Sequence, residues 1–120
     1  MATVTDDNIS TKILPADCLA AIFDWETGFL YLYAQGKYDT PTMTSFVELP
    51  WIGSLKFAFQ GVYSGGSESR DPMEHRYAQK IKPRLVQKEP LKEVLVVVAA
   101  GPGEKDKVVP VPVETVPLLQ

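Results

Sequence analysis

The chain has little of what most enzyme and metal sites are built from. Among its 120 residues there is one cysteine, Cys18, and one histidine, His75. A single cysteine forms no disulfide within the chain, and one cysteine with one histidine cannot supply the ligands of a structural zinc site. Because no second cysteine and no adjacent base accompanies it, we expect Cys18 to be a small buried hydrophobic residue rather than a reactive thiol.

The short motifs that hold cofactors are also absent. The sequence has no glycine-rich phosphate loop, no dinucleotide fingerprint and no G-x-S-x-G nucleophile elbow. Its acidic run at residues 6–8 lacks the glycine-spaced ligands and the distal glutamate of a calcium loop. The sequence therefore predicts no metal and no cofactor.

Long hydrophobic runs and excess charge of one sign are missing too. The longest apolar run, residues 94–100, is far shorter than the roughly 20 residues of a membrane-spanning helix, and the N-terminus lacks the basic and apolar regions of a secretory signal. The net charge is -3 and the isoelectric point is near 5.1, so the field of the whole molecule repels nucleic acid and anionic membranes. We expect a soluble cytoplasmic protein that binds neither.

What the sequence does contain is a series of short strand patterns. Hydrophobic residues make up 45% and charged residues 22% of the chain, which is typical of one globular domain, residues 1–120. In residues 55–63, LKFAFQGVY, side chains alternate with the period of a half-buried strand. Residues 28–35 and 93–100 are apolar on both faces, which indicates interior strands, and residues 43–49 are a further short candidate.

A hairpin is predicted over residues 18–35. The sequence DWETG joins two apolar runs, and its Gly28 can take the positive φ of a bulged turn. A helix over residues 16–23 is the competing interpretation, because Leu19, Ile22 and Phe23 share a helical stripe. The hairpin is favoured over the helix.

The C-terminal segment, residues 107–116, carries two prolines two positions apart. In an extended strand, Pro110 and Pro112 leave the same edge without N–H donors, so the segment is predicted to be an edge strand protected against addition of another chain. With a weak segment at residues 9–14 we count seven to eight short strands. The sequence predicts a mainly β fold, an antiparallel β-sandwich or small barrel.

One short helix is predicted near residues 72–79. Asp71 is a preferred N-cap residue, Pro72 suits the first helical position, and Glu74 falls where its carboxylate can complete a capping box. Met73 and Tyr77, four residues apart, would form the inward stripe of this helix.

The same segment holds His75, the residue on which an enzyme would depend. A catalytic site would use His75 as general base, Asp71 or Glu74 as the orienting carboxylate, and Ser67 or Ser69 as nucleophile. In the predicted helix, neighbouring residues face different directions and the Asp71 carboxylate is engaged in capping, so these groups do not converge. The sequence therefore assigns no catalytic residue and favours a protein that is not an enzyme.

Two groups of residues offer binding surface instead. Lys80, Lys82 and Arg84 share one face of an extended segment in the most basic part of the chain, where an anionic ligand or an acidic protein surface would bind. Trp51 lies in a predicted loop, and together with Tyr38 and other tyrosines it would form a stacking platform for a sugar or a peptide.

These observations favour a small binding or protein-interaction module. The first alternative is a small-ligand or carbohydrate binder that uses Trp51 and nearby tyrosines, and the weaker alternative is an enzyme that uses His75. The expected partner is another protein or a second copy of the chain, because several strands are apolar on both faces, more than a lone two-layer sandwich of this size covers.

Overall fold

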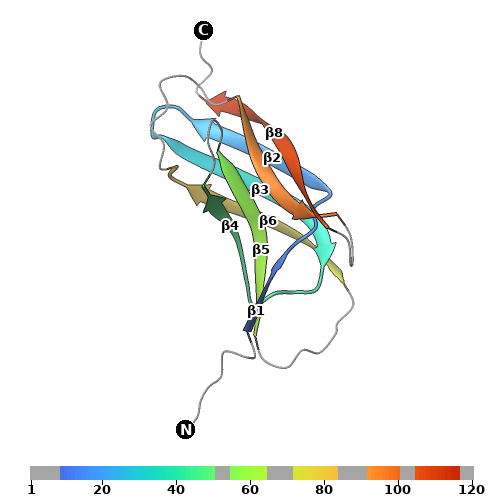
Figure 1. Ribbon diagram of the computed structural model, residues 1–120. Helices are drawn as coiled ribbons and strands as arrows, with labels where there is room; N and C mark the ends of the chain where they lie inside the picture. The colour runs from blue at the N-terminus through green and yellow to red at the C-terminus, as the bar shows by residue number, and fades with distance from the viewer. Residues whose placement is uncertain (1–8, 51–54, 65–71, 84–91, 101–104, 117–120) are drawn as a thin grey trace.

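The computed structural model describes residues 9–50, 55–64, 72–83, 92–100 and 105–116, and its regular structure within these ranges consists of strands (Figure 1). No helix among these residues is long and apolar enough to cross a membrane. The prediction of a mainly β fold is confirmed. The eight strands are β1 (Ile9–Ile13), β2 (Cys18–Asp24), β3 (Phe29–Tyr38), β4 (Met43–Leu49), β5 (Lys56–Ser64), β6 (Met73–Ile81), β7 (Glu93–Ala99) and β8 (Asp106–Val116).

All eight strands belong to one mixed sheet that curls into a half-barrel. Its order is β1-β5-β7-β8-β2-β3-β6, and β4 also pairs with β5. The pairs β2–β8 and β5–β7 are parallel, and the others are antiparallel. The predicted purely antiparallel sandwich is therefore not confirmed. Both parallel pairs join segments far apart in the sequence, and the periodicity of a strand does not reveal its partner.

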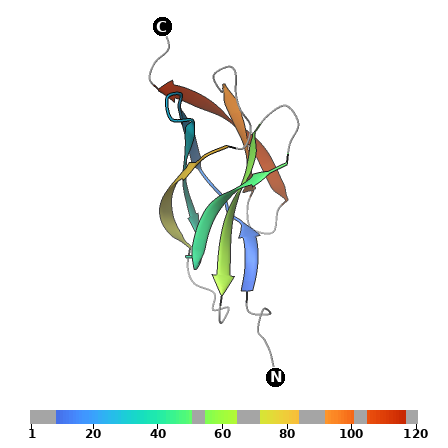
Figure 2. The ribbon, with the colours of Figure 1, turned by 90° about the vertical axis from the view of Figure 1, so that its left-hand side faces the viewer.

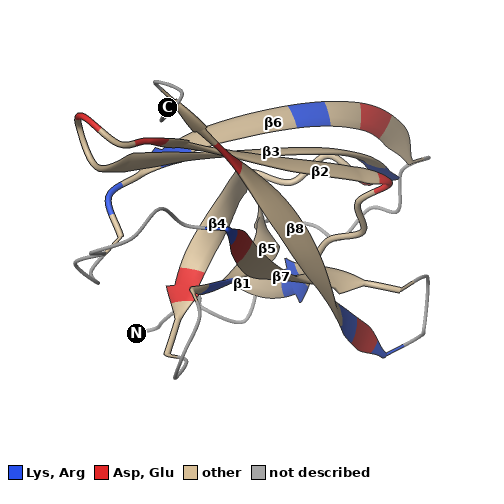
Figure 3. Cartoon of the chain, turned by 90° about the horizontal axis from the view of Figure 1, so that it is seen from above, with Lys and Arg blue, Asp and Glu red and all other residues tan. Residues whose placement is uncertain are grey.

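The curled sheet has two layers. Seen from above, β6, β3 and β2 form one layer, β1, β4, β5 and β7 form the other, and β8 runs from one to the other (Figure 3). The core lies between them, and the side view in Figure 2 shows how the strands wrap around it. Its largest fully buried side chains come from both layers and from the linker after β1: Leu14, Leu30, Leu32, Phe57, Phe59, Val94, Val96 and Val98.

The predicted hairpin of residues 18–35 is confirmed. β2 and β3 pair antiparallel from Cys18↔Gln35 to Asp24↔Phe29. The Asp24 carboxylate accepts a hydrogen bond from the Glu26 N–H at 3.0 Å, which tightens the turn. Gly28 has φ 81°, the positive value expected of it. The competing helix over residues 16–23 does not form, because Cys18–Asp24 is a strand.

Residues 72–79 do not form the predicted helix. Met73–Ile81 are strand β6, which pairs with β3 over nine residues, and Asp71, the expected N-cap, lies outside the described residues. The N-cap is worth only about 1 kcal/mol. A nine-residue ladder, with Tyr77 and Ile81 packed against the core, outweighs that local preference.

The C-terminal strand is an edge strand along only part of its length. Residues 106–112 pair with β7, and residues 113–116 pair with β2. The Val113 N–H donates to the Lys92 carbonyl at 2.9 Å, and the Val116 carbonyl accepts from the Trp25 N–H at 2.7 Å. The backbone N–H and C=O groups of odd-numbered residues of β8 therefore point towards β7, and those of even-numbered residues point towards β2. The predicted edge strand is corrected: the end of β8 is interior to the sheet.

The two prolines determine where β8 and β2 separate. Pro110 and Pro112 are even-numbered and face β2, and the ladder with β2 begins at Val113, directly after them. The next donor in register would be the nitrogen of Pro112, which carries no hydrogen. The strands part there and leave a groove of about 210 Å³ between the prolines and the segment around Asp17.

On the open side of the half-barrel, the side chain of Gln79 bridges β4 and β6 by hydrogen bonds. The Gln79 amide of β6 accepts a hydrogen bond from the Phe46 N–H of β4 at 2.8 Å and donates to the Phe46 carbonyl at 3.2 Å. The Tyr77 hydroxyl also donates to Gln79 Oε1, at 2.7 Å. The amide thus replaces a missing neighbouring strand for Phe46, whose ring stacks on Phe59 with centroids 4.9 Å apart.

We expect Gln79→Leu to weaken the contact between β4 and β6. The substitution leaves the Phe46 N–H and carbonyl unpaired at a partly buried position, which should lower the free energy of unfolding by about 1–3 kcal/mol. Urea unfolding measures the loss, and hydrogen exchange should show faster exchange at the Phe46 amide. Gln60→Leu, at a half-buried position of β5, is the matched control. Unchanged exchange at Phe46 would contradict the bridging role.

We expect Pro112→Val to extend the β2–β8 ladder. The new N–H faces β2 next to the last existing pair, Ala21↔Val113, so its exchange with solvent should be slowed. Pro110→Val is the matched control, because its new N–H faces the groove where β2 has already separated. Equal exchange rates for the two new amides would show that the prolines do not determine where the strands part.

Candidate functional site

One exposed sheet face gathers apolar and charged side chains from strands that are distant in the sequence. Along β3, even-numbered residues point into the core and odd-numbered residues point outward. The register adds outward residues of β2 and β6 beside them. We call this surface the outer face. Its members on these three strands are Cys18, Ala20, Ile22, Asp24, Phe29, Tyr31, Tyr33, Gln35, Lys37, Glu74, Arg76, Ala78 and Lys80.

Tyr33 lies at the centre of the outer face. It is 39% exposed, and its neighbours in the same row are Ala20 on β2 and Ala78 on β6. Because the two alanines are short, an open hollow of about 290 Å³ lies beside the ring, with Gln35 and Arg76 also lining it. A protruding aromatic side chain thus stands next to a depression of comparable size.

The β6 side of the outer face is mainly basic, with Glu74 as the one acidic residue of β6 on it. Lys80 and Lys82 place their ammonium groups 4.6 Å and 5.3 Å from the centre of the Phe29 ring, where cation–π attraction holds them. Arg76 lies on the same side of β6. The prediction put Lys80, Lys82 and Arg84 on one face of the chain, and both lysines are exposed. Arg84 lies outside the described residues.

The opposite side of the outer face is acidic. Glu114 of β8 pairs in register with Ile22 of β2 and is exposed, and Asp24 ends β2 one row further on. Figure 3 shows an acidic stretch of β8 where it crosses the layer of β2, β3 and β6, and it shows both a basic and an acidic stretch along β6. The apolar centre is therefore flanked by charges of opposite sign.

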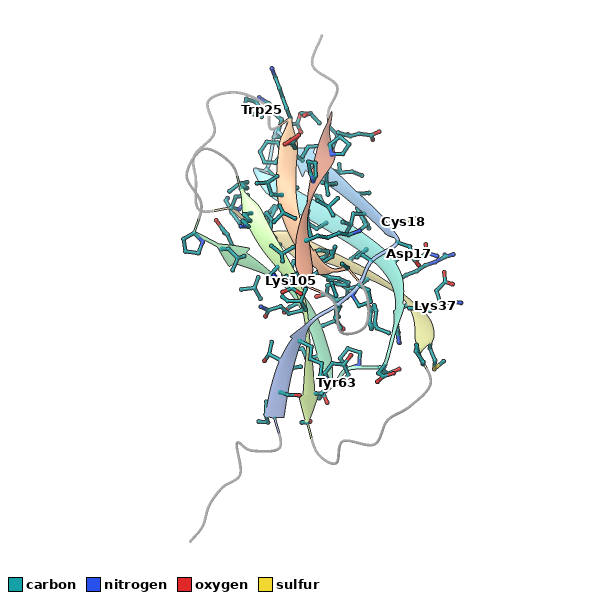
Figure 4. All side chains as sticks on the ribbon, turned by 45° about the vertical axis from the view of Figure 1, so that its right-hand side comes forward. Asp17, Cys18, Trp25, Lys37, Tyr63 and Lys105 are labelled. Atoms are coloured by element: carbon teal, nitrogen blue, oxygen red, sulfur yellow. The ribbon has the colours of Figure 1, made fainter. Side chains whose placement is uncertain are left out.

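The residues predicted to form an aromatic platform do not come together. Trp51 lies outside the described residues. Tyr38 is only 6% exposed and packs edge-to-face against Phe59, so its side chain offers little surface to a ligand. The Tyr63 hydroxyl donates to the Asp39 carbonyl at 2.6 Å, and Figure 4 shows Tyr63 towards the end of the molecule opposite Trp25.

His75 has an aromatic partner and a hydroxyl partner. Its ring stacks on Tyr38 with centroids 4.5 Å apart, and its Nε2 lies 3.2 Å from the Thr40 hydroxyl. Glu74 points to the opposite face of β6 and accepts a hydrogen bond from the Gln35 amide. Alternation along a strand thus separates Glu74 from His75, whereas the sequence prediction separated them by the geometry of a helix. Ser67, Ser69 and Asp71 lie outside the described residues, and the described residues hold no cluster of metal-ligating side chains.

Cys18 is exposed, which corrects the prediction that it is buried. It begins β2 on the outer face, next to Asp17 at the side of the molecule (Figure 4). The apolar residues that follow it misled the prediction, because alternation places Cys18 and Ala20 outward while Ala21 and Phe23 point into the core.

The centre of the outer face was missed by sequence reasoning, although half of the signal was visible. The alternation of residues 28–35 correctly indicated that Phe29, Tyr31 and Tyr33 share a face. Because neither face of this segment is polar, the same alternation predicts an interior strand. β3 is interior within the sheet, yet only one of its faces is covered, and Ala20 and Ala78 meet Tyr33 only through the register.

We expect alkaline pH to destabilise the protein through its half-buried and buried tyrosines. Burial raises the pKa of Tyr38, Tyr63 and Tyr77 above the ordinary value of 10.0. The folded state therefore holds these protons more tightly, and the stability they contribute is present below about pH 10 and lost as the pH rises through the raised pKa values. Urea unfolding between about pH 8 and about pH 12 should show this fall. Tyr38→Phe should reduce it, and an unchanged slope in that variant would contradict the assignment.

Protein-family models, curated proteins and solved structures gave no match to the chain. The functional argument therefore rests on the outer face itself: an apolar centre around Tyr33, a hollow beside it, a basic side on β6 and an acidic side on β8 and β2.

Proposed function

We propose that the protein is a non-catalytic interaction module that recognises a protein partner through the outer face. The observation that carries this proposal is the half-exposed Tyr33 between Ala20 and Ala78, with charged residues at both sides of the face. Specific interfaces have this composition, an apolar and aromatic centre within a polar rim, with tyrosine and arginine enriched. Exposed apolar surface on a sheet is otherwise costly for a protein to retain.

The energetics of the outer face support a few anchor residues. An aromatic side chain that enters a well-packed site on a partner can dominate the free energy of binding, while the surrounding contacts exclude water. Tyr33 is the best placed anchor, because it stands on a central strand that is paired on both sides. Little conformational freedom remains for its backbone to lose on binding.

A protein partner is favoured over a small ligand by the shape of the surface. Pockets for small molecules usually enclose about 300–1,000 Å³ and bury most of the ligand. The hollow beside Tyr33 measures about 290 Å³ and is open to solvent along one side. The carbohydrate alternative relied on Trp51 and Tyr38, and Tyr38 lies in the core.

Site-specific cross-linking tests this function. With the photoreactive amino acid p-benzoylphenylalanine at position 33, irradiation in an extract of the source cells should give a defined covalent adduct with a protein. Excess wild-type chain should suppress the adduct, and the Ala78→Arg variant should not, because it fills the hollow with a charged side chain.

The control carries the same photoreactive amino acid at position 47. Val47 is also 39% exposed, but it lies on β4, away from the outer face. Comparable yields from positions 33 and 47, or an adduct that wild-type chain and Ala78→Arg suppress equally well, would overturn the proposal.

A further inference from the structure

We propose that the partner of the outer face is a second copy of the chain, bound across a two-fold axis that runs between β2 and β3, parallel to them. This inference rests on the proposed function and adds the identity of the partner and the geometry of the complex. It follows from two properties of the outer face, its relief and its distribution of charge. Rotation about this axis places protruding side chains of one copy over small side chains of the other, and basic residues over acidic ones.

The relief of the face is self-complementary. A two-fold axis between β2 and β3 superposes β3 of one copy on β2 of the other, row by row. Tyr33 then lies over the partner's Ala20, because the two residues share a row of the sheet, and the same contact occurs twice. The hollow of about 290 Å³ beside Tyr33 has room for an aromatic ring, since a cavity of about 150 Å³ holds benzene. In the next row Tyr31 meets the partner's Ile22.

The same rotation also brings residues of opposite charge together. β6 and β8 lie at equal distances from the axis, about 7 Å on either side at the usual strand spacing, so each β6 faces the β8 of the other copy. Lys80 and Glu114 belong to the row of Ile22 and Tyr31, and so they oppose each other twice. The basic side of one copy thus covers the acidic side of the other.

Charge is less favourable in the other simple two-fold arrangement. An axis across the strands in the row of Tyr33 would place β6 of one copy on β6 of the other and bring Arg76 and Lys80 together at two contacts, although Glu74 would then lie towards Lys82. Opposed like charges at an interface cost several kcal/mol, whereas exposed ion pairs add little affinity and mainly select the orientation. The aligned arrangement, in which the strands of both copies run in the same direction, is also a common way for two sheet faces to pack.

The size of the outer face fits a reversible dimer. Four neighbouring strands span about 15–20 Å across the face, and the paired rows cover a similar length. This is at the small end of specific interfaces, where association is transient rather than obligate. We therefore expect a concentration-dependent equilibrium between monomer and dimer.

Sedimentation equilibrium of the purified full chain tests the dimer. The mass should rise with concentration from 13.3 kDa towards twice that value. Lys80→Glu places two acidic groups opposite each other at both symmetric contacts, and Glu114→Lys places two basic groups there, so each variant alone should dimerise about tenfold more weakly or worse. An equimolar mixture of the two variants should recover association, because each then meets the opposite charge.

The matched control is Lys107→Glu, which reverses an exposed lysine at the far end of β8 and should leave the dimer unchanged. A wild-type chain that stays monomeric up to millimolar concentration would overturn the proposal. The proposal would also be overturned if both charge-reversal variants dimerised as strongly as the wild-type chain, or if the mixture of the two variants did not recover association.

The outcome separates this inference from the proposed function. A monomeric wild-type chain together with a specific adduct at position 33 on a different protein would overturn the second copy and leave the interaction module in place. A monomeric chain without any specific adduct at position 33 would overturn both.

Discussion

Four residue pairs between β8 and β2 hold the two layers of this protein in one sheet. The first part of β8 is bound to β7 in one layer, and its last four residues are bound to β2 in the other. The core side chains lie between the layers, so their burial depends on this crossing strand. Pro110 and Pro112 limit the crossing, because they withhold the donors that would continue the ladder towards β2.

The other side of the half-barrel is held by different means. No described strand bridges β4 and β6, and the Gln79 amide supplies the hydrogen bonds of a strand at a single residue, Phe46. Aromatic rings fill the space below it: Phe46, Phe59, Tyr77, Tyr38 and His75. The layer of β2, β3 and β6 is thereby fixed along both margins. Its outer face is consequently a firm surface, which is what a binding site made of small and aromatic side chains requires.

The outer face also explains why residues 28–35 are apolar on both sides. Leu30 and Leu32 are buried in the core, whereas Tyr31 and Tyr33 stand on the opposite face with Ala20 and Ala78 around them. Core packing accounts for the first set alone. A bound partner that covers Tyr31 and Tyr33 would explain why the outer side of this strand is apolar. The opposite charges of Lys80 and Glu114 would then determine the orientation of that partner.

By itself, the sequence determined most of the strands and the hairpin at Gly28. These depend on local rules: side-chain alternation and the positive φ that glycine tolerates. The tertiary structure alone decided that Met73–Ile81 is a strand, although its residues favour a helix, because pairing with β3 outweighs a helix cap. It alone decided that β8 is interior at its end and that Tyr33 meets Ala20 and Ala78, because register and parallel pairing depend on distant partners that no local pattern specifies.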